Sequence, residues 1–359
     1  MSLLLKKPRL LFLYSELADY FLACIRELVS GNDVEVHVMH WPVNKEAPFA
    51  FEFPSGVNFY DRNQFDLKSL KEKVQAISPD FIYCSGWMDR DYMTVAQGYK
   101  SKIPVVIGLD TKWTGTFRQQ VACILSRFTL YKIFSHCWVP GQKQKKYALK
   151  LGFKDNQIMT GYYSADTNYF KALGEKINSF KQKNYPHRLI FVGRYYEFKG
   201  VKDLWEAFIQ WQKESNNDWE LWCLGVGDVE PVIHPKIKHF GFIQPKDMEP
   251  YLMGTGVFVM PSHFEPWGVV LQEFAAAGFP LICSDEVGSV EAFLRDKENG
   301  YIYHAGDINA LKECIKKITS LPDSELSKMG KMSTALASKI SPETWAKTVM
   351  SLLENKISI

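Results

Sequence analysis

The stretch SHFEPWGVVLQEFAAAG, residues 262–278, decides the fold of this 359-residue chain. The apolar run before it, residues 256–260, is typical of a buried strand, and Pro261 ends that strand because proline cannot donate to a sheet ladder. From Val269 onward the pattern is helical, and Gly278 ends the helix. We therefore predict a strand, a loop and a helix whose first amides could bind an anion.

Two carboxylates belong to this stretch, Glu265 in the loop and Glu273 in the early helix. Carboxylates accept hydrogen bonds, and the diols of a sugar or a ribose donate them in pairs. Together with the helix N-terminus they suit a ligand that has both phosphates and hydroxyls, as a nucleotide sugar does. The alternative is a plain strand, loop and helix with two solvated glutamates.

The stretch also resembles the signature of a known protein family. A glutamate, seven residues and a second glutamate, after Pro-Ser, resemble the signature of family 4 retaining glycosyltransferases of GT-B fold. GRYYEFKG at 193–200 resembles the Gly-Arg…Lys-Gly element of that family, and LGVGD at 224–228 and FGFI at 240–243 resemble its nucleotide-base segments. The match is close from about residue 189 to 306 and weak in the N-terminal half.

Strands alternate with helices in both halves of the chain, which predicts an α/β protein with parallel sheets. The resemblance implies two Rossmann-like lobes that face a central cleft. Residues 1–168 would form an acceptor-binding domain, residues 185–340 a nucleotide-sugar-binding domain, and residues 341–359 a helix that packs back on the first. Residues 165–186 are polar and show no clear period, so we expect the linker there.

Arg194 and Lys199 flank a loop between a strand and a helix, where a diphosphate would sit in an α/β sheet. They could neutralise the charge that develops on a leaving nucleoside diphosphate, or they could be solvated surface cations. The resemblance implies that Glu265 contacts the donor sugar near the reacting centre and that Glu273 accepts from the ribose. Further donor contacts are expected from Gly193, Gly225, Gly227, Phe242, Ile243, Trp267, Gly268, Val269, Val270 and Ser289.

Three of these expectations carry a qualification. Trp267 stands where the family often has phenylalanine, and Ser289 could equally be a structural turn residue. Asp110 follows a predicted strand and resembles the first-lobe polar residue that faces the donor, where family members often have histidine. We expect Asp110 to orient the acceptor hydroxyl or to polarise the transition state. The alternative is a helix N-cap before Trp113.

No metal or other cofactor is expected, because the nucleotide sugar is a substrate. Asp89 and Asp91 match the Asp-x-Asp of metal-dependent glycosyltransferases, but we expect them to start a helix. The eight histidines show no ligand spacing, and the seven cysteines form no Cys-x-x-Cys pair. His263 is the histidine worth testing, because it neighbours Glu265.

Charge is distributed unevenly along the chain. Residues 1–165 carry 21 Lys and Arg against 15 Asp and Glu, while the whole chain has a net charge of +3. Between Phe117 and Lys154 there are eight cations, no acidic residue and several aromatic residues. Residues 117–154 could contact an anionic membrane and bring the chain to a lipid-linked acceptor, or the aromatic residues could be core and the cations a solvated face. No nucleic-acid partner is expected, because no recognised module accompanies these residues.

No apolar run reaches the ~18–20 residues of a membrane span, and the N-terminal charges are in the wrong order for a signal peptide. We therefore expect a cytoplasmic protein, with a peripheral location at the inner face of the membrane as the other option. The function expected is retaining, metal-independent transfer of a sugar from a nucleotide sugar to a hydroxyl of a glycan or lipid-linked acceptor, in surface polysaccharide biosynthesis. A UDP-sugar is favoured and a GDP-sugar is the other option. The alternatives are a nucleotide-sugar epimerase of the same fold and a non-catalytic nucleotide-sugar-binding subunit.

Overall fold

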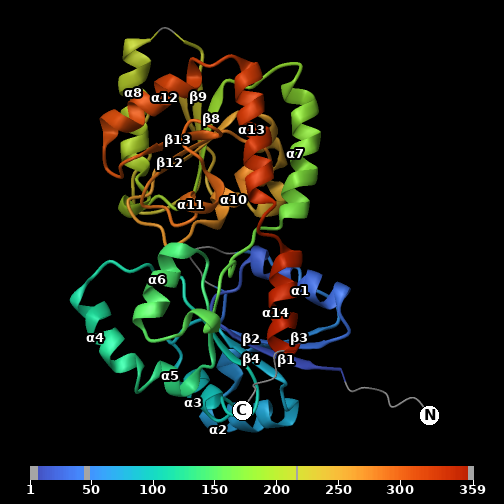
Figure 1. The fold of residues 1–359 in the computed structure, drawn as a ribbon. Coiled ribbons are helices and arrows are strands. Elements are labelled where there is room, and N and C mark those ends of the chain that lie inside the picture. Colours follow the sequence, from blue (N-terminus) through green and yellow to red (C-terminus); the bar gives the residue numbers. More distant parts are fainter. Residues whose placement is uncertain (1–6, 44–48, 216, 355–359) are drawn as a thin grey trace. The chain divides into compact units, whose positions relative to one another are not determined.

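The computed structural model describes residues 7–43, 49–215 and 217–354 (Figure 1). The chain forms two compact units. Unit 1 comprises Met1–Ser164 and Pro342–Ile359, and unit 2 comprises Ala165–Ser341. Each unit is built around one parallel sheet with helices on both faces.

Unit 1 contains a seven-stranded sheet in the order β3-β2-β1-β4-β5-β6-β7. The strands are β1 (Arg9–Tyr14), β2 (Glu35–His40), β3 (Val57–Asp61), β4 (Phe81–Cys84), β5 (Val105–Gly108), β6 (His136–Trp138) and β7 (Ile158–Met159). The α-helices are α1 (Asp19–Gly31), α2 (Leu67–Ile77), α3 (Arg90–Gln97), α4 (Phe117–Ser126), α5 (Leu130–Ile133), α6 (Gln142–Lys150) and α14 (Pro342–Glu354). Short 3₁₀ turns lie at Arg62–Gln64 and Asp155–Gln157. Strand β1 is buried from Leu10 to Tyr14, which explains its continuous apolar sequence.

Unit 2 contains a six-stranded sheet in the order β10-β9-β8-β11-β12-β13. The strands are β8 (Arg188–Val192), β9 (Glu220–Leu224), β10 (Ile237–His239), β11 (Val257–Met260), β12 (Leu281–Ser284) and β13 (Gly300–Tyr303). The α-helices are α7 (Thr167–Lys181), α8 (Val201–Glu214), α9 (Glu249–Met253), α10 (Val269–Ala276), α11 (Val290–Phe293), α12 (Ile308–Thr319) and α13 (Asp323–Ala337), with 3₁₀ turns at Glu197–Lys199 and Pro245–Asp247. Helices α8 and α12 cover one face of this sheet, and α7, α10 and α13 cover the other (Figure 1).

Both sheets reverse their strand order at one place. The chain starts in the middle of each sheet, builds outward to one side, and then returns to build the other side. The reversal falls between β1 and β4 in unit 1 and between β8 and β11 in unit 2. The loops that leave the carboxyl ends of two such strands run in opposite directions, and a ligand can bind between them.

The expected linker at 165–186 is wrong. Most of it is helix α7, which Asp166 caps and which buries Phe170, Leu173 and Ile177 against unit 2. Those three apolar residues recur at helical spacing, but many polar residues separate them, so the period is weak in the sequence. The boundary between the units lies between residues 164 and 165, ahead of this helix and four residues before the expected end of the first domain at residue 168.

The last helix returns to the first unit, as the predicted fold class has it. Helix α14 packs against α1 in unit 1 (Figure 1). Its Trp345 stacks on Phe12 and on Trp138, with ring centroids 5.8 Å and 5.0 Å apart, and its indole N–H donates to the Tyr162 carbonyl at 3.0 Å. No helix in the described part of the chain is both long and apolar enough to cross a membrane.

Candidate functional site

The predicted donor-binding residues of unit 2 lie along one edge of its sheet, at the carboxyl ends of the strands. They follow β10 (Phe242, Ile243), β9 (Gly225, Gly227), β8 (Gly193, Arg194, Lys199), β11 (Glu265, Trp267, Gly268, Val269, Val270, Glu273) and β12 (Ser289). Residues from five separate segments are thus brought to one edge, and the loops after β8 and β11 flank the reversal of strand order.

The loops after β8 and β9 touch through glycines. The Gly193 amide donates to the Leu224 carbonyl at 3.0 Å, and the Tyr195 amide donates to the Val226 carbonyl at 2.8 Å. Gly225 has a φ of +144°, and a Cβ atom there would lie 1.9 Å from the Gly193 carbonyl oxygen. A side chain at position 225 would therefore separate the two loops. Phe242 and Ile243, after β10, are half-buried.

Lys199 and Glu265 form an ion pair across the reversal point. Lys199 ends the 3₁₀ turn after β8, and Glu265 lies in the loop after β11. Their side chains are 17% and 13% exposed, so the charges are only partly screened by water. The alternative of a solvated cation is therefore wrong for Lys199. Arg194 is exposed, and its guanidinium lies 5.1 Å from the centroid of the Tyr196 ring.

Helix α10 begins beside this pair. Gly268 adopts a left-handed conformation with a φ of +86°, and no side chain among the described residues caps the helix, so the amides of Val269 and Val270 stand at an open N-terminus. Such a terminus favours negative charge. Glu273 lies one turn further along and is partly buried.

Ser289 and Trp267 both support the loop after β11. The Ser289 amide donates to the Trp267 carbonyl at 2.9 Å, and its hydroxyl donates to the Gly268 carbonyl at 3.1 Å. This is the structural role that the sequence analysis weighed for Ser289. The Trp267 indole is buried edge-on against Phe293, and its N–H has no hydrogen-bond partner among the described residues.

Sequence reasoning did not include Asp203, in the first turn of α8. The His263 imidazole Nε2 lies 2.6 Å from the Asp203 carboxylate, and the His263 amide donates to the Phe198 carbonyl at 2.8 Å. His263 thus joins the loop after β11 to the start of α8. In the sequence, His263 was notable only because it lies two residues before Glu265. Its partner Asp203 is 60 residues away, so no local pattern indicated the pair.

Asp110 lies at the carboxyl edge of the unit 1 sheet, after β5. One carboxylate oxygen accepts a hydrogen bond from the Tyr163 hydroxyl at 3.1 Å. Asp110 does not cap a helix, because α4 begins only at Phe117 and its cap is Thr116. The N-cap alternative for Asp110 is therefore wrong, and its proposed part in catalysis remains a prediction.

The Asp-x-Asp motif has a structural role. Asp89 caps α3, as expected, by accepting from the amides of Asp91 and Tyr92. Its other oxygen accepts from Arg62 at 2.9 Å, and Asp91 accepts from the same guanidinium at 2.5 Å. Burial opposes ionisation of Asp89, but the hydrogen bonds from Arg62, the Tyr92 amide and the Trp41 indole, together with the charge of Arg62, outweigh it and lower the pKa of the carboxyl. Within the described residues, no group of three or more His, Cys, Asp or Glu side chains could hold a metal ion.

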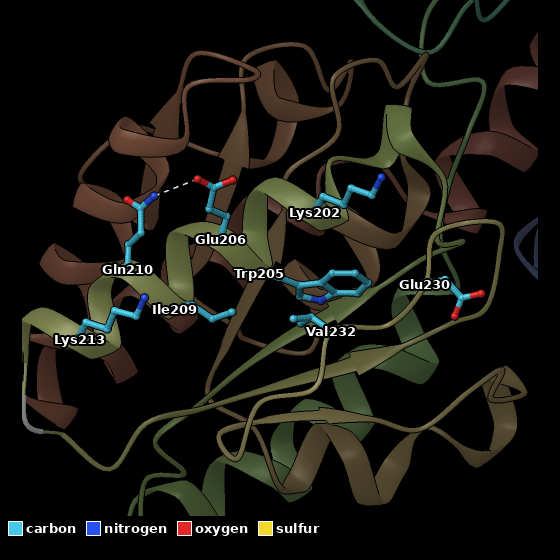
Figure 2. Close-up of a pocket in the computed structure, with 8 residues that line it drawn as sticks. All are labelled: Lys202, Trp205, Glu206, Ile209, Gln210, Lys213, Glu230 and Val232. Carbon is cyan, nitrogen blue, oxygen red and sulfur yellow. Dashed lines mark hydrogen bonds between the residues drawn. The ribbon is translucent and has the colours of Figure 1, made fainter.

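A pocket of about 430 Å³ lies elsewhere on unit 2, along the outer side of α8 (Figure 2). The side chains that line it are those of Lys202, Trp205, Glu206, Ile209, Gln210, Lys213, Glu230 and Val232. Its floor is apolar, with Trp205 and Val232 next to each other, and charged residues surround it (Figure 2). None of the predicted site residues lines this pocket.

Solved structures share the whole fold. HepE from Anabaena in complex with UDP has a TM-score of 0.71 at 14% identity, over 96% of this chain and 99% of that chain. A sucrose-phosphate synthase from Thermosynechococcus elongatus has a TM-score of 0.70 at 17% identity, over 97% of this chain and 98% of that chain. The two Rossmann-like units and the returning helix are those of the GT-B fold, as the sequence analysis predicts.

The second unit contains the residues that match a family model. Residues 186–320 match the family model described as Glycosyl transferases group 1. The lipopolysaccharide core biosynthesis glycosyltransferase LpsE of Rhizobium meliloti is 30% identical over 138 residues, which are 36% of this chain and 38% of LpsE. The capsular polysaccharide biosynthesis glycosyltransferase CapM of Staphylococcus aureus is 23% identical over 275 residues, 70% of this chain and 71% of CapM. The chain thus matches well under half of LpsE. Residues 186–320 are thus similar to the group 1 glycosyltransferases, as the sequence resemblance predicts.

Proposed function

We propose that this chain transfers a sugar from a nucleotide sugar, a UDP-sugar in preference to a GDP-sugar, to a hydroxyl of a glycan or lipid-linked acceptor. One observation carries the proposal. The Lys199–Glu265 ion pair joins the two loops that flank the reversal point of the unit 2 sheet, beside the open N-terminus of α10. Cation, carboxylate and free amides in one place suit a ligand that is both a diphosphate and a polyol.

The related proteins support the donor and the setting. HepE has been solved with UDP and with UDP-glucose, which favours a uridine donor. LpsE and CapM take part in lipopolysaccharide core and capsular polysaccharide biosynthesis, which favours a surface polysaccharide as the product.

The ion pair gives the site a simple order of events. Without donor, Glu265 neutralises Lys199. A bound diphosphate would compete for the Lys199 ammonium and leave Glu265 free to accept from a sugar hydroxyl. As the bond between the sugar and the diphosphate breaks, Lys199 and Arg194 would stabilise the charge that develops on the leaving group. Those two cations would do this without a metal ion.

The reaction we propose retains the anomeric configuration. The acceptor hydroxyl would attack from the side of the leaving group, and the departing phosphate would take its proton. Asp110, held by the Tyr163 hydroxyl, would orient the acceptor hydroxyl. Glu273 would accept from the ribose hydroxyls, and the backbone of Gly225 and Gly227 would approach the base and phosphates.

Calorimetric titration with UDP, GDP and ADP, each with and without EDTA, tests the donor site. We expect UDP to bind most tightly, EDTA to have no effect, and Glu273→Gln to weaken binding at least tenfold.

Lys199→Ala should lower turnover about 10²–10³-fold. Lys202→Ala is the matched control, because Lys202 is an exposed cation three residues away that pairs with Glu197.

An unchanged UDP dissociation constant in Glu273→Gln would refute the ribose role. Equal turnover of Lys199→Ala and Lys202→Ala would remove Lys199 from the mechanism. The anomeric configuration of the product, read by NMR, tests retention. Conversion of the UDP-sugar without any acceptor would instead identify an epimerase.

A further inference from the structure

Helix α4 in unit 1 directs its largest apolar side chains toward solvent. Phe117, Ile124 and Phe128 are 79%, 68% and 66% exposed, and Leu125 is exposed as well. These positions are spaced by seven, one and three residues, so they fall on one side of the helix and of the turn that follows it. The side that faces the unit carries the buried polar residues Gln119 and Ser126, and also the small residues Ala122 and Cys123, which pack against the core.

Hydrogen bonds fix the helix in this orientation. The Gln119 amide nitrogen donates to the Lys112 carbonyl at 2.8 Å, and its amide oxygen accepts from the Thr114 backbone at 2.8 Å. The Ser126 hydroxyl donates to the Leu151 carbonyl at 2.6 Å. Turning the apolar side inward would break these bonds and leave buried polar groups unpaired. The apolar side of α4 is therefore held toward solvent by specific hydrogen bonds. Figure 1 shows α4 at the margin of unit 1, apart from the sheet.

The stretch that contains α4 is rich in exposed cations. Arg118 and Arg127, at the two ends of α4, are exposed, and so are Lys132, Lys146, Lys150 and Lys154. No acidic residue lies between Phe117 and Lys154. The aromatic residues of this stretch differ in burial: Phe117 and Phe128 are exposed and Tyr131 is partly buried, whereas the others, Phe134, Trp138, Tyr147 and Phe153, are core. Within residues 117–154, the part that could contact a membrane is therefore α4, the turn that follows it and the exposed cations.

We propose that α4 lies in the headgroup region of an anionic lipid bilayer, with Phe117, Ile124, Leu125 and Phe128 inserted toward the acyl chains. Flanking arginines are suited to that position, because their stems cross apolar surface while their guanidinium groups reach lipid phosphates. A second copy of this chain fits the face less well, since a two-fold contact would bring the same arginines together. This inference rests on the proposed function where it concerns a lipid-linked acceptor, but lipid binding can be measured without any donor.

The test is cosedimentation of the full chain with vesicles of phosphatidylcholine, with and without about a third phosphatidylglycerol. We expect binding that needs the anionic lipid and falls as salt rises from about 50 to 500 mM. Phe117→Ser with Phe128→Ser should lower the partition coefficient at least tenfold, whereas Phe117→Leu with Phe128→Leu should keep most of it. Arg118→Gln with Arg127→Gln should also lower it, more strongly at low salt than at high salt.

Two variants serve as matched controls. Ile233→Ser removes a fully exposed apolar side chain from unit 2, and Lys316→Gln with Lys317→Gln removes two exposed cations from α12. Neither should change lipid binding, and circular dichroism melting would show that each variant is folded. UDP affinity of the α4 variants should equal that of the parent protein, so a failure of lipid binding and a failure of the donor site would be told apart.

The proposal is overturned if the serine variants bind vesicles as the parent protein does, or if binding ignores the anionic lipid. It is also overturned if the protein binds no vesicles and sedimentation shows a dimer that Phe117→Ser with Phe128→Ser dissociates. That result would make α4 an interface between copies of this chain.

Discussion

Single residues in unit 2 show two ways of holding a lysine away from water. Lys199 has a carboxylate partner, Glu265, which an incoming phosphate would replace in the proposed function. Lys181, at the end of α7, is buried, and its ammonium has no hydrogen-bond partner among the described residues. It lies 3.4 Å from the centroid of the Phe279 ring. A cation over an aromatic face recovers only part of the hydration that burial removes.

Lys181 leads to a prediction about stability and pH. Burial lowers the pKa of Lys181 to about 7, whereas an unfolded lysine titrates near 10.4. Between these two values the unfolded chain binds the extra proton, so the free energy of unfolding should rise with pH from about 7 to 10. Lys181→Met should therefore stabilise unit 2 by roughly 2–5 kcal/mol at pH 6, where the penalty is fully present, and by much less near pH 10.

Urea unfolding at several pH values measures this difference. Lys183→Met is the matched control, because Lys183 is exposed and two residues away. A stabilisation by Lys181→Met that stayed constant between pH 6 and pH 10 would show that packing, rather than the buried charge, is responsible.

Elements differ in how far the sequence predicts them. Strand β11 and helix α10 follow the expected pattern, because local residues set their ends. Pro261 follows the last residue of the strand, and Gly268 and Gly278, both at positive φ, flank the helix. The Lys199–Glu265 pair joins residues 66 apart, and only the strand order of the folded sheet brings them together. Helix α7 was not predicted from the sequence, because its buried residues are few and widely spaced. For α4 the sequence left open whether the aromatic residues are exposed or core, since an apolar stripe normally faces the core and only the fold shows which side is turned to solvent.

Helix α14 carries the next prediction. Trp345 lies between Phe12 and Trp138 in the core of unit 1 and donates to the Tyr162 carbonyl. Trp345→Ala would leave a cavity and an unpaired carbonyl, so we expect a loss of about 3–5 kcal/mol in the free energy of unfolding of unit 1. Lys347→Ala, at an exposed position of the same helix, should change it by less than about 0.5 kcal/mol. Equal effects in chemical denaturation would mean that α14 contributes little to that core.

The molecule as a whole separates its predicted tasks between the two units. The donor residues predicted from the family signature belong to unit 2, while Asp110 and the apolar side of α4 belong to unit 1. Charge follows the same division, because residues 1–165 carry a net +6 and the remainder carries a net −3. A basic first part suits an anionic surface or acceptor, whereas the donor site needs only a few well-placed cations.

This division predicts where a nucleotide acts on the intact chain. A ligand that binds only folded unit 2 stabilises it by about 2.7 kcal/mol at a hundredfold excess over its dissociation constant. UDP should therefore slow hydrogen exchange in residues 193–200 and 265–273 and, through global opening, slow the core strands β8 and β11 about a hundredfold. Strand β1 and helix α14 of unit 1 should exchange as before. In Glu273→Gln the same UDP concentration should protect much less, and in Lys202→Ala it should protect as in the parent chain. Protection of β1 instead of β8 would place the nucleotide in unit 1 and refute the assignment of the donor site to the loops after β8 and β11.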